Sequence, residues 1–295
     1  MAMRRVCLNK VERVREQISE AYGSAVTRQS GKACCGDLAK SSACDIGYSE
    51  ADLALLPEGA ADTSFGCGNP LALIDIAPGE TVVDLGSGAG LDLLIAAHRV
   101  GPTGRVIGID MTGEMIAQAR RNILAAGLEN AEIREGVIED LPIESGSVDL
   151  VISNCVINLS TDKDQVFSEI ARVLKPGGRI QVSDIVLEEK AMPAWLEEER
   201  DLHAELYSAC IAGAISETAY LEGLSRAGLI DAEIRERIPY GADDIRGFID
   251  SGDAPVNLPA GGSARGVTRA RVDELIAALT GKVWGAKVFA RKPLN

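Results

Sequence analysis

Cysteine offers the widest range of chemistry in this chain, since only two histidines, His98 and His203, are present. The seven cysteines are Cys7, Cys34, Cys35, Cys44, Cys67, Cys155 and Cys210. Their number is odd, and no apolar leader is visible in the charged N-terminal stretch, so we do not expect the disulfide framework of a secreted protein. Thiols of a cytoplasmic protein that are not simply packed are usually metal ligands or redox groups.

Three cysteines lie on separate segments that could converge on one ligand. Cys155 follows an expected strand in SNCVINL, Cys67 lies between two glycines in FGCGN, and Cys210 occurs in YSACIAGA. A soft, thiophilic ion prefers such a site to hard oxygen ligands. The absence of a C-x-x-C pair and of a nearby histidine disfavours zinc. Cys155 could instead be a small buried apolar residue, which is a common role of free cysteine.

A second candidate site follows the strand expected at 81–85. That strand runs into GSGAG at 86–90, and glycines at such a turn let backbone N–H groups approach a ligand. The spacing differs from the dinucleotide pattern G-x-G-x-x-G, and Asp84 would repel a pyrophosphate, which disfavours an NAD(P)-linked oxidoreductase. Asp110 ends the next strand, where its carboxylate can accept hydrogen bonds from ribose hydroxyls.

Four segments, VVDLGSGAG, VIGIDM, VIEDLPI and LKPGG, resemble in this order the S-adenosylmethionine-dependent methyltransferases of the Rossmann-like class. In that class the first segment is the cofactor loop, the second contains the acid that binds ribose, here Asp110, and the third lies beside the adenine. The resemblance implies that the cofactor is bound by Asp84, Gly86, Ser87, Gly88, Gly90, Asp110, Met111, Ile138, Glu139 and Asn154.

A more specific resemblance is carried by FGCGNP, DLGSGAG, SNCVINLS and CIAGA, which are similar to segments of arsenite S-adenosylmethionine methyltransferases from about residue 20 to 235. SNCVINL discriminates best, because methyltransferases in general need no cysteine there. The resemblance implies that the thiolates of Cys67, Cys155 and Cys210 bind As(III). Phe65 departs from the pattern, since many members have a tyrosine at that position.

The same resemblance implies a disulfide relay that includes an upstream cysteine. Cys35 is the preferred candidate, while Cys34 and Cys44 stay open as alternatives, and Cys7 is expected to take no part. Thioredoxin or glutathione would reduce the resulting disulfide. Two other functions stay open: methylation of another small molecule, and As(III) binding by the thiols without catalysis.

Composition limits the partners of the protein. The 295 residues include 30 Lys and Arg against 44 Asp and Glu, which gives a net charge of −14. Nucleic acid and anionic membranes are therefore not expected to bind. No apolar run approaches the length of a membrane-spanning helix. We expect a cytoplasmic monomer that acts on a small molecule.

The elements that would position these residues alternate between strand and helix. We expect strands at 81–85, 105–109, 131–135, 148–153 and 179–186 and helices at 91–99, 114–126 and 163–174. Such alternation predicts an α/β fold with a doubly wound, mostly parallel Rossmann-like methyltransferase sheet and a smaller C-terminal α+β region. Ligands of such sheets bind at the carboxyl ends of the strands, where Cys155 and Asp110 are expected.

Outside the alternating region the expectations are coarser. Helices are expected at 1–30, at 49–56 with Ser49 as N-cap, over most of 192–228 and at 269–280, and a strand at 282–291. Thr161 is the expected cap of the helix at 163–174, and Pro176-Gly177-Gly178 is expected to end it. We expect an N-terminal helix and cysteine-containing segment at 1–64, a cofactor-binding domain at 65–190, and an arsenic-binding and lid region at 191–295.

Overall fold

The computed structural model describes residues 10–27, 47–57, 60–61, 66, 68–199, 213–251 and 269–295. Several predicted site residues lie outside these ranges: Cys7, Cys34, Cys35, Cys44, Phe65, Cys67 and Cys210. Cys155 is the one cysteine among the described residues.

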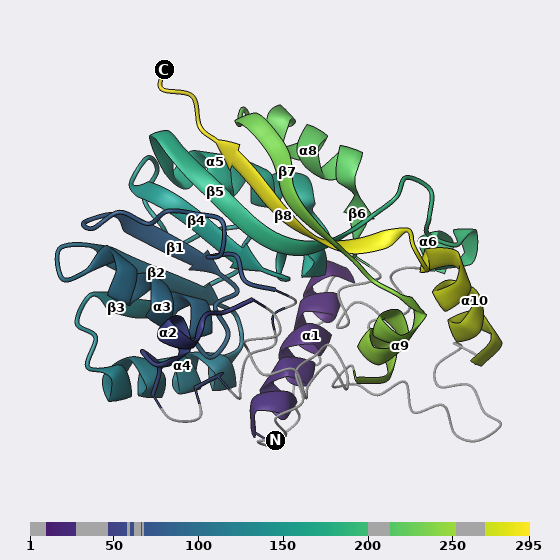
Figure 1. The fold of residues 1–295 in the computed structure, drawn as a ribbon, viewed down its shortest axis with the longest axis horizontal. Coiled ribbons are helices and arrows are strands. Elements are labelled where there is room, and N and C mark those ends of the chain that lie inside the picture. The colour runs from purple at the N-terminus through teal and green to yellow at the C-terminus, as the bar shows by residue number, and fades with distance from the viewer. Residues whose placement is uncertain are drawn as a thin grey trace, which may run out of the picture.

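One mixed sheet crosses the molecule, with its strands in the order β3-β2-β1-β4-β5-β8-β7 (Figure 1). Their bounds are β1 (Thr81–Leu85), β2 (Arg105–Asp110), β3 (Ala131–Glu135), β4 (Val148–Asn154), β5 (Leu174–Leu187), β7 (Ile230–Pro239) and β8 (Val283–Arg291). Strands β1 to β5 pair in parallel, whereas β8 is antiparallel to both β5 and β7. The short β6 (Ile215–Ser216) also pairs with β5. The mostly parallel, doubly wound sheet predicted from the sequence is confirmed.

Alternating apolar side chains divide the core between the two faces of the sheet. On one face, Val82 and its neighbours pack against α3 (Leu91–Val100), beside which lies α4 (Gly113–Ala126). On the other face, Val83 and its neighbours pack against α5 (Lys163–Val173) and α8 (Glu217–Arg226). Both faces of the parallel strands are therefore buried.

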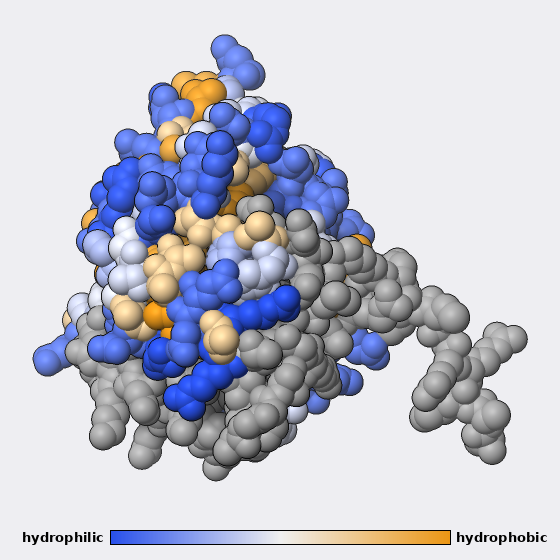
Figure 2. Space-filling view, turned by 90° about the vertical axis from the view of Figure 1, so that its right-hand side faces the viewer, coloured by the Kyte–Doolittle hydropathy of each residue, from blue (hydrophilic) through white to orange (hydrophobic). Residues whose placement is uncertain are grey.

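A further apolar cluster joins the ends of β5 and β8 to the C-terminal helices. These helices are α6 (Ala194–Glu199), α9 (Ala242–Ser251) and α10 (Arg269–Leu279). Figure 1 shows them grouped at one end of the sheet, with α1 (Lys10–Thr27) between them and α4. The face shown in Figure 2 has hydrophilic residues around a smaller group of apolar ones.

Local signals in the sequence predict several element ends correctly. Ser49 caps α2 (Glu50–Leu53), because its side chain accepts a hydrogen bond from the Asp52 N–H. Gly127 ends α4 in the left-handed conformation that glycine adopts without strain. The predicted strands β1, β2, β3, β4 and β8 and helices α3, α4, α5 and α10 agree with the structure to within about two residues.

Other expectations are wrong. Asp162, not Thr161, caps α5, because Asp162 directly precedes the first helical residue and its carboxylate accepts the Gln165 N–H. The helix ends at Val173, before Pro176-Gly177-Gly178, and β5 starts at Leu174 with a register shift opposite Val148 and Leu150. Within 192–228, β6 replaces part of the expected helix, and β7 and α9 were not expected at all.

Candidate functional site

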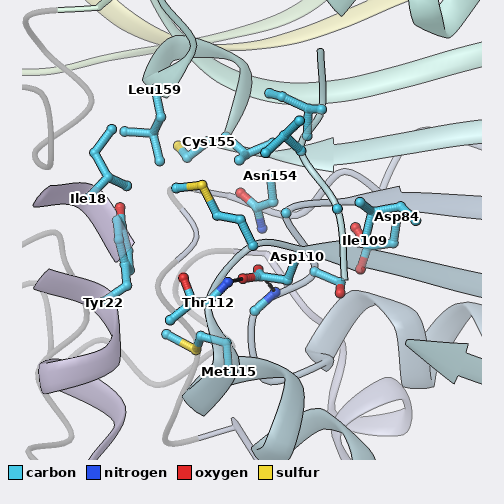
Figure 3. Close-up of a pocket in the computed structure, with 18 of the residues that line it drawn as sticks. Ile18, Tyr22, Asp84, Ile109, Asp110, Thr112, Met115, Asn154, Cys155 and Leu159 are labelled. Carbon is cyan, nitrogen blue, oxygen red and sulfur yellow. Dashed lines mark hydrogen bonds between the residues drawn. The ribbon is translucent and has the colours of Figure 1, made fainter. Parts of the chain in front are cut away.

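A cavity opens at the carboxyl ends of β1, β2 and β4, where a doubly wound sheet binds its ligands. It contains about 1030 Å³ of space between atoms, part of it open to solvent. In Figure 3, Ile18 and Tyr22 of α1 line one side, across from Asn154 and Asp110. The helix α1 therefore forms a wall of the cavity that the expected sheet alone would not supply.

The glycine loop after β1 forms the floor of the cavity. Gly86 and Gly88 have positive φ angles of 61° and 52°, which L-residues with side chains rarely adopt. A Cβ at Gly86 would lie 2.4 Å from a methyl group of Val156, so the loop touches the segment that carries Cys155. Gly90 does not line the cavity: it precedes α3 and lies against Ala119 of α4.

Asp110, at the end of β2, is hydrogen-bonded to the glycine loop. Its carboxylate accepts hydrogen bonds from the N–H groups of Gly88 (2.9 Å) and Thr112 (2.8 Å), which Figure 3 shows as dashed lines. Burial raises the pKa of Asp110, and these two N–H groups oppose that shift. Each carboxylate oxygen has a further lone pair, so Asp110 can also accept hydrogen bonds from the hydroxyl groups of a ligand.

Asp84 is a buried carboxylate with an unused acceptor. Its Oδ2 atom has no hydrogen-bond partner among the described residues. Burial and the charges of Asp92 and Asp110 raise its pKa well above the ordinary value. A buried acceptor of this kind is costly unless a donor reaches it, and a cationic donor in the cavity would be the most favourable.

Glu139, in the loop after β3, also lines the cavity. Its carboxylate accepts a hydrogen bond from the Ser160 hydroxyl (2.6 Å) and forms a 3.1 Å ion pair with Arg15 of α1. Val137 and Ile138 line the cavity beside it. The loop after β3 is thus tied both to α1 and to the segment after β4.

Asn154 and Asp92 belong to a buried polar network under the cavity. The Asn154 amide donates to Gly68 O (2.6 Å) and to Asp92 Oδ2 (3.1 Å), and the Tyr48 hydroxyl donates to Asp92 Oδ1 (2.7 Å). Burial raises the pKa of Asp92 to about 6 despite these donors, and burial together with the Asp92 charge raises the pKa of Tyr48. Tyr48 and Asp92 were not predicted as site residues.

Cys155 follows β4 with an unusual backbone. Its φ angle is 59°, in the left-handed region that non-glycine residues rarely occupy, and its N–H donates to Ser183 O (2.8 Å). The residue is 3% exposed and packs with Leu159 and the apolar C-terminal cluster. Its sulfur is disulfide-bonded, so a thiolate forms there only after reduction.

The cavity brings together most of the residues that the sequence pointed to. Among its lining residues are Asp84, Gly86, Ser87, Gly88, Asp110, Met111, Ile138, Glu139, Asn154 and Cys155. Their binding of a cofactor or of arsenic stays a prediction. Sequence reasoning missed the lining residues Arg15, Ile18, Tyr22, Asp92, Thr112, Met115, Leu159 and Ser160. Those on α1 could not be found, because a helix pattern does not say where the helix packs.

Two properties of the described residues concern membranes and metal ions. None of their helices combines the length and the apolar character of a membrane-spanning segment. They also contain no group of three or more His, Cys, Asp or Glu side chains that could hold a metal ion. Cys67 and Cys210 lie outside the described residues.

The strand order and the acid-lined glycine loop place the protein in the Rossmann-like class of nucleoside-cofactor enzymes. Residues 76–230 match a family model described as a methyltransferase domain. Over 262 residues the chain is 40% identical to an arsenite methyltransferase of Halobacterium salinarum, a match that covers 84% of this chain and 64% of that protein. An arsenite methyltransferase of Aquipseudomonas alcaligenes is 36% identical, with coverages of 81% and 68%.

The chain is also similar to a solved structure whose described activity matches that of these relatives. An arsenic(III) S-adenosylmethionine methyltransferase from Chlamydomonas reinhardtii superposes with a TM-score of 0.62 at 30% identity, covering 82% of this chain and 72% of that one. The chain therefore belongs to the arsenite methyltransferase family. It spans just under two thirds of the length of the Halobacterium relative.

Proposed function

We propose that this protein transfers methyl groups from S-adenosylmethionine to As(III) held by cysteine thiolates. The observation that carries the proposal is the position of Cys155: it lines the cavity whose other walls are the glycine loop and Asp110. Methyl transfer to a carbon or oxygen nucleophile requires no thiol at this position, whereas a thiolate there is a natural ligand for a soft ion.

The residues present fit the cofactor. The unpartnered Asp84 Oδ2 would accept a hydrogen bond from the ammonium group of the cofactor. Asp110 would accept hydrogen bonds from the ribose hydroxyls, and Ile138 and Glu139 would lie beside the adenine. When bound, S-adenosylmethionine supplies an electrophilic methyl group that the lone pair of thiolate-held As(III) can take. The buried aspartates also favour a ligand that brings positive charge.

The remaining chemistry belongs to the thiols of the chain. Cys155, together with Cys67 and Cys210, would hold As(III), and positioning rather than a general base would supply the catalysis. Formation of the As–C bond formally oxidises arsenic by two electrons. Two thiols would return it to the trivalent state by forming a disulfide, with Cys35, or else Cys34 or Cys44, in the relay. Thioredoxin or glutathione would then reduce that disulfide.

Arsenic speciation tests this proposal. Reduced protein is incubated with S-adenosylmethionine, arsenite and a thiol reductant, and the arsenic species are separated with element-specific detection. We expect methylated arsenic from the wild type and from Cys7→Ser, and none from Cys155→Ser. The Cys155→Ser protein should bind S-adenosylhomocysteine as tightly as the wild type.

Two results would contradict the proposal in different ways. Stoichiometric binding of As(III) without any methylated product would favour a thiol-based binding protein. Loss of S-adenosylhomocysteine binding in Cys155→Ser would show that Cys155 serves the cofactor pocket and not the arsenic ligand set.

A further inference from the structure

Lys287 of β8 is a buried lysine that the proposed chemistry does not use. It is 3% exposed, although the ammonium group of lysine is seldom buried without a specific partner. Its neighbours on the paired strands are Ser183 of β5 and Glu236 of β7. Burial lowers its pKa, while the charges of Glu236 and Asp92 oppose that change.

The partner of this ammonium group is a backbone carbonyl near a predicted arsenic ligand. Lys287 Nζ donates a hydrogen bond to Asn69 O, two residues after Cys67 in the sequence. The Asn69 side chain fixes the same segment further, since its amide donates to Gly47 O (2.8 Å) and its oxygen accepts the Leu71 N–H (2.7 Å).

The glycines on both sides of Cys67 lie tightly against the sheet. A Cβ at Gly68 would lie 2.3 Å from Ser183 Oγ and 3.2 Å from Lys287 Nζ, and a Cβ at Gly66 would lie 2.2 Å from the Asn154 amide nitrogen. The Gly68 carbonyl also accepts the hydrogen bond from Asn154, the residue before Cys155. Gly68 is thus attached to the end of β4 through Asn154, and Asn69 to β8 through Lys287.

We infer that Lys287 is a positioning residue for arsenic: its bond to Asn69 O keeps Gly68 and Asn69, which follow Cys67 in the sequence, beside the end of β4, where Cys155 lies. This inference rests on the proposed function, in which both thiolates bind one ion. Chelation by residues far apart in the chain is favourable only if the protein fixes their separation before the ion binds. Without Lys287 the segment keeps its link to Asn154 but loses the one to β8.

The test compares two lysines that both bond to backbone carbonyls. Lys287→Met keeps the length of the side chain but removes the ammonium donor to Asn69 O, which then keeps only the long hydrogen bond from the Ala72 N–H (3.4 Å). Lys292→Met is the matched control, because Lys292 Nζ donates to Ala171 O (2.7 Å) and Leu174 O (2.8 Å) at the end of α5. For Lys287→Met we expect the KM for arsenite to rise about tenfold or more, the scale on which small misplacements act. The Kd for S-adenosylhomocysteine should stay unchanged, and Lys292→Met should change neither value.

Hydrogen exchange supplies a readout that does not need turnover. The amides of Gly68, Asn69, Leu71 and Ala72 should exchange faster in Lys287→Met than in the wild type and in Lys292→Met. If Lys287→Met does not fold, Gly68→Ala displaces the same residues, because its Cβ would meet Ser183 Oγ at 2.3 Å and Lys287 Nζ at 3.2 Å, and the same two changes are expected of it.

Unchanged exchange at these four amides, or faster exchange with an unchanged KM for arsenite, would overturn the role of Lys287. A larger loss of S-adenosylhomocysteine binding than of arsenite affinity would overturn it as well. Failure of the proposed function looks different, since the wild type itself would then form no methylated arsenic, whether or not it binds arsenite.

Discussion

Buried aspartates dominate the electrostatics of single residues in this protein. Asp84, Asp92 and Asp110 lie under the glycine loop, and burial raises the pKa of each. Asp184 lies at the end of β5, fully buried, and burial raises its pKa to about 7. In a chain of net charge −14, each of these groups favours either a proton or a cation nearby.

Asp110→Asn should weaken binding of S-adenosylmethionine by about 1–3 kcal/mol, the cost of a buried polar mismatch. The amide NH₂ of asparagine would face the Gly88 or Thr112 N–H, which are both donors. Titration calorimetry measures the change. Asp149→Asn is the control, because Asp149 also accepts a backbone N–H, that of Thr81, but at the amino end of the strands. Equal losses in both variants would contradict a role of Asp110 in cofactor binding.

Asp184→Asn should remove part of the dependence of stability on pH. The folded pKa of Asp184, about 7, lies above the ordinary value of 3.8, so its contribution is fully present below pH 3.8 and is lost as the pH rises to about 7. Asparagine mimics the protonated acid and keeps the oxygen that accepts the Asn158 amide and the Ile185 N–H.

Urea denaturation of the reduced proteins from pH 5 to pH 7.5 tests this expectation. The free energy of unfolding of the wild type should fall relative to that of Asp184→Asn, by at most about 1.4 kcal/mol per pH unit. Asp84 and Asp92 are present in both proteins and cancel in the difference. Parallel curves would show that Asp184 is already ionised at pH 5.

At the scale of elements, α1 forms a wall of the cavity that is joined to the loop after β3 by an ion pair. Arg15 pairs with Glu139 of the loop after β3, and both side chains are partly shielded from solvent. Arg15→Gln should therefore weaken S-adenosylmethionine binding about two- to fivefold, the range of a partly exposed ion pair. The dissociation rate of the ligand, measured by stopped flow, should rise by the same factor.

Arg226→Gln is the matched control for this element. It removes an exposed ion pair of similar length with Asp164 between α8 and α5, away from the cavity. Neither the affinity nor the dissociation rate should change in that variant. An equal effect in both variants would assign the change to net charge and not to α1.

The sequence predicted elements well where apolar runs end in glycine or a capping residue. TVVDL before the glycine loop is an example, since all its residues except Thr81 are fully buried. Strand β7 could not be found in this way, because IDAEIRERIP is exposed at most positions and has no apolar run. The elements with a mixed pattern needed the tertiary structure to identify them.

The candidate site was predictable to a similar degree. Asp84, Asp110 and Cys155 follow strands, and the strand ends of a parallel sheet share one edge, so their proximity follows from the sequence. Lys287 could not be predicted, because it is a lysine in an apolar strand and only the antiparallel register of β8 brings it beside Asn69.

For the whole molecule, β8 is the strand on which the C-terminal part depends. It pairs along its length with β5 and β7, and Val288 is buried between the layers. Val288→Ala should lower the free energy of unfolding by about 2 kcal/mol, the cost of a small cavity in a core. Leu124→Ala is the control, since Leu124 is 82% exposed, and its change should stay within about 0.5 kcal/mol. A small loss in Val288→Ala would indicate that β8 is not part of the cooperative core.

The order of strands also determines when each strand can find its partner during translation. Among the described residues β7 pairs only with β8, yet more than forty residues separate the two strands in the chain. A nascent chain that has completed β7 therefore carries an unpaired strand, beside an open edge of β5, until the ribosome has made β8. Unpaired edges invite association with other chains. Slow translation between residues 240 and 282 would therefore prolong exposure of this edge, whereas rapid translation through the same stretch would shorten it.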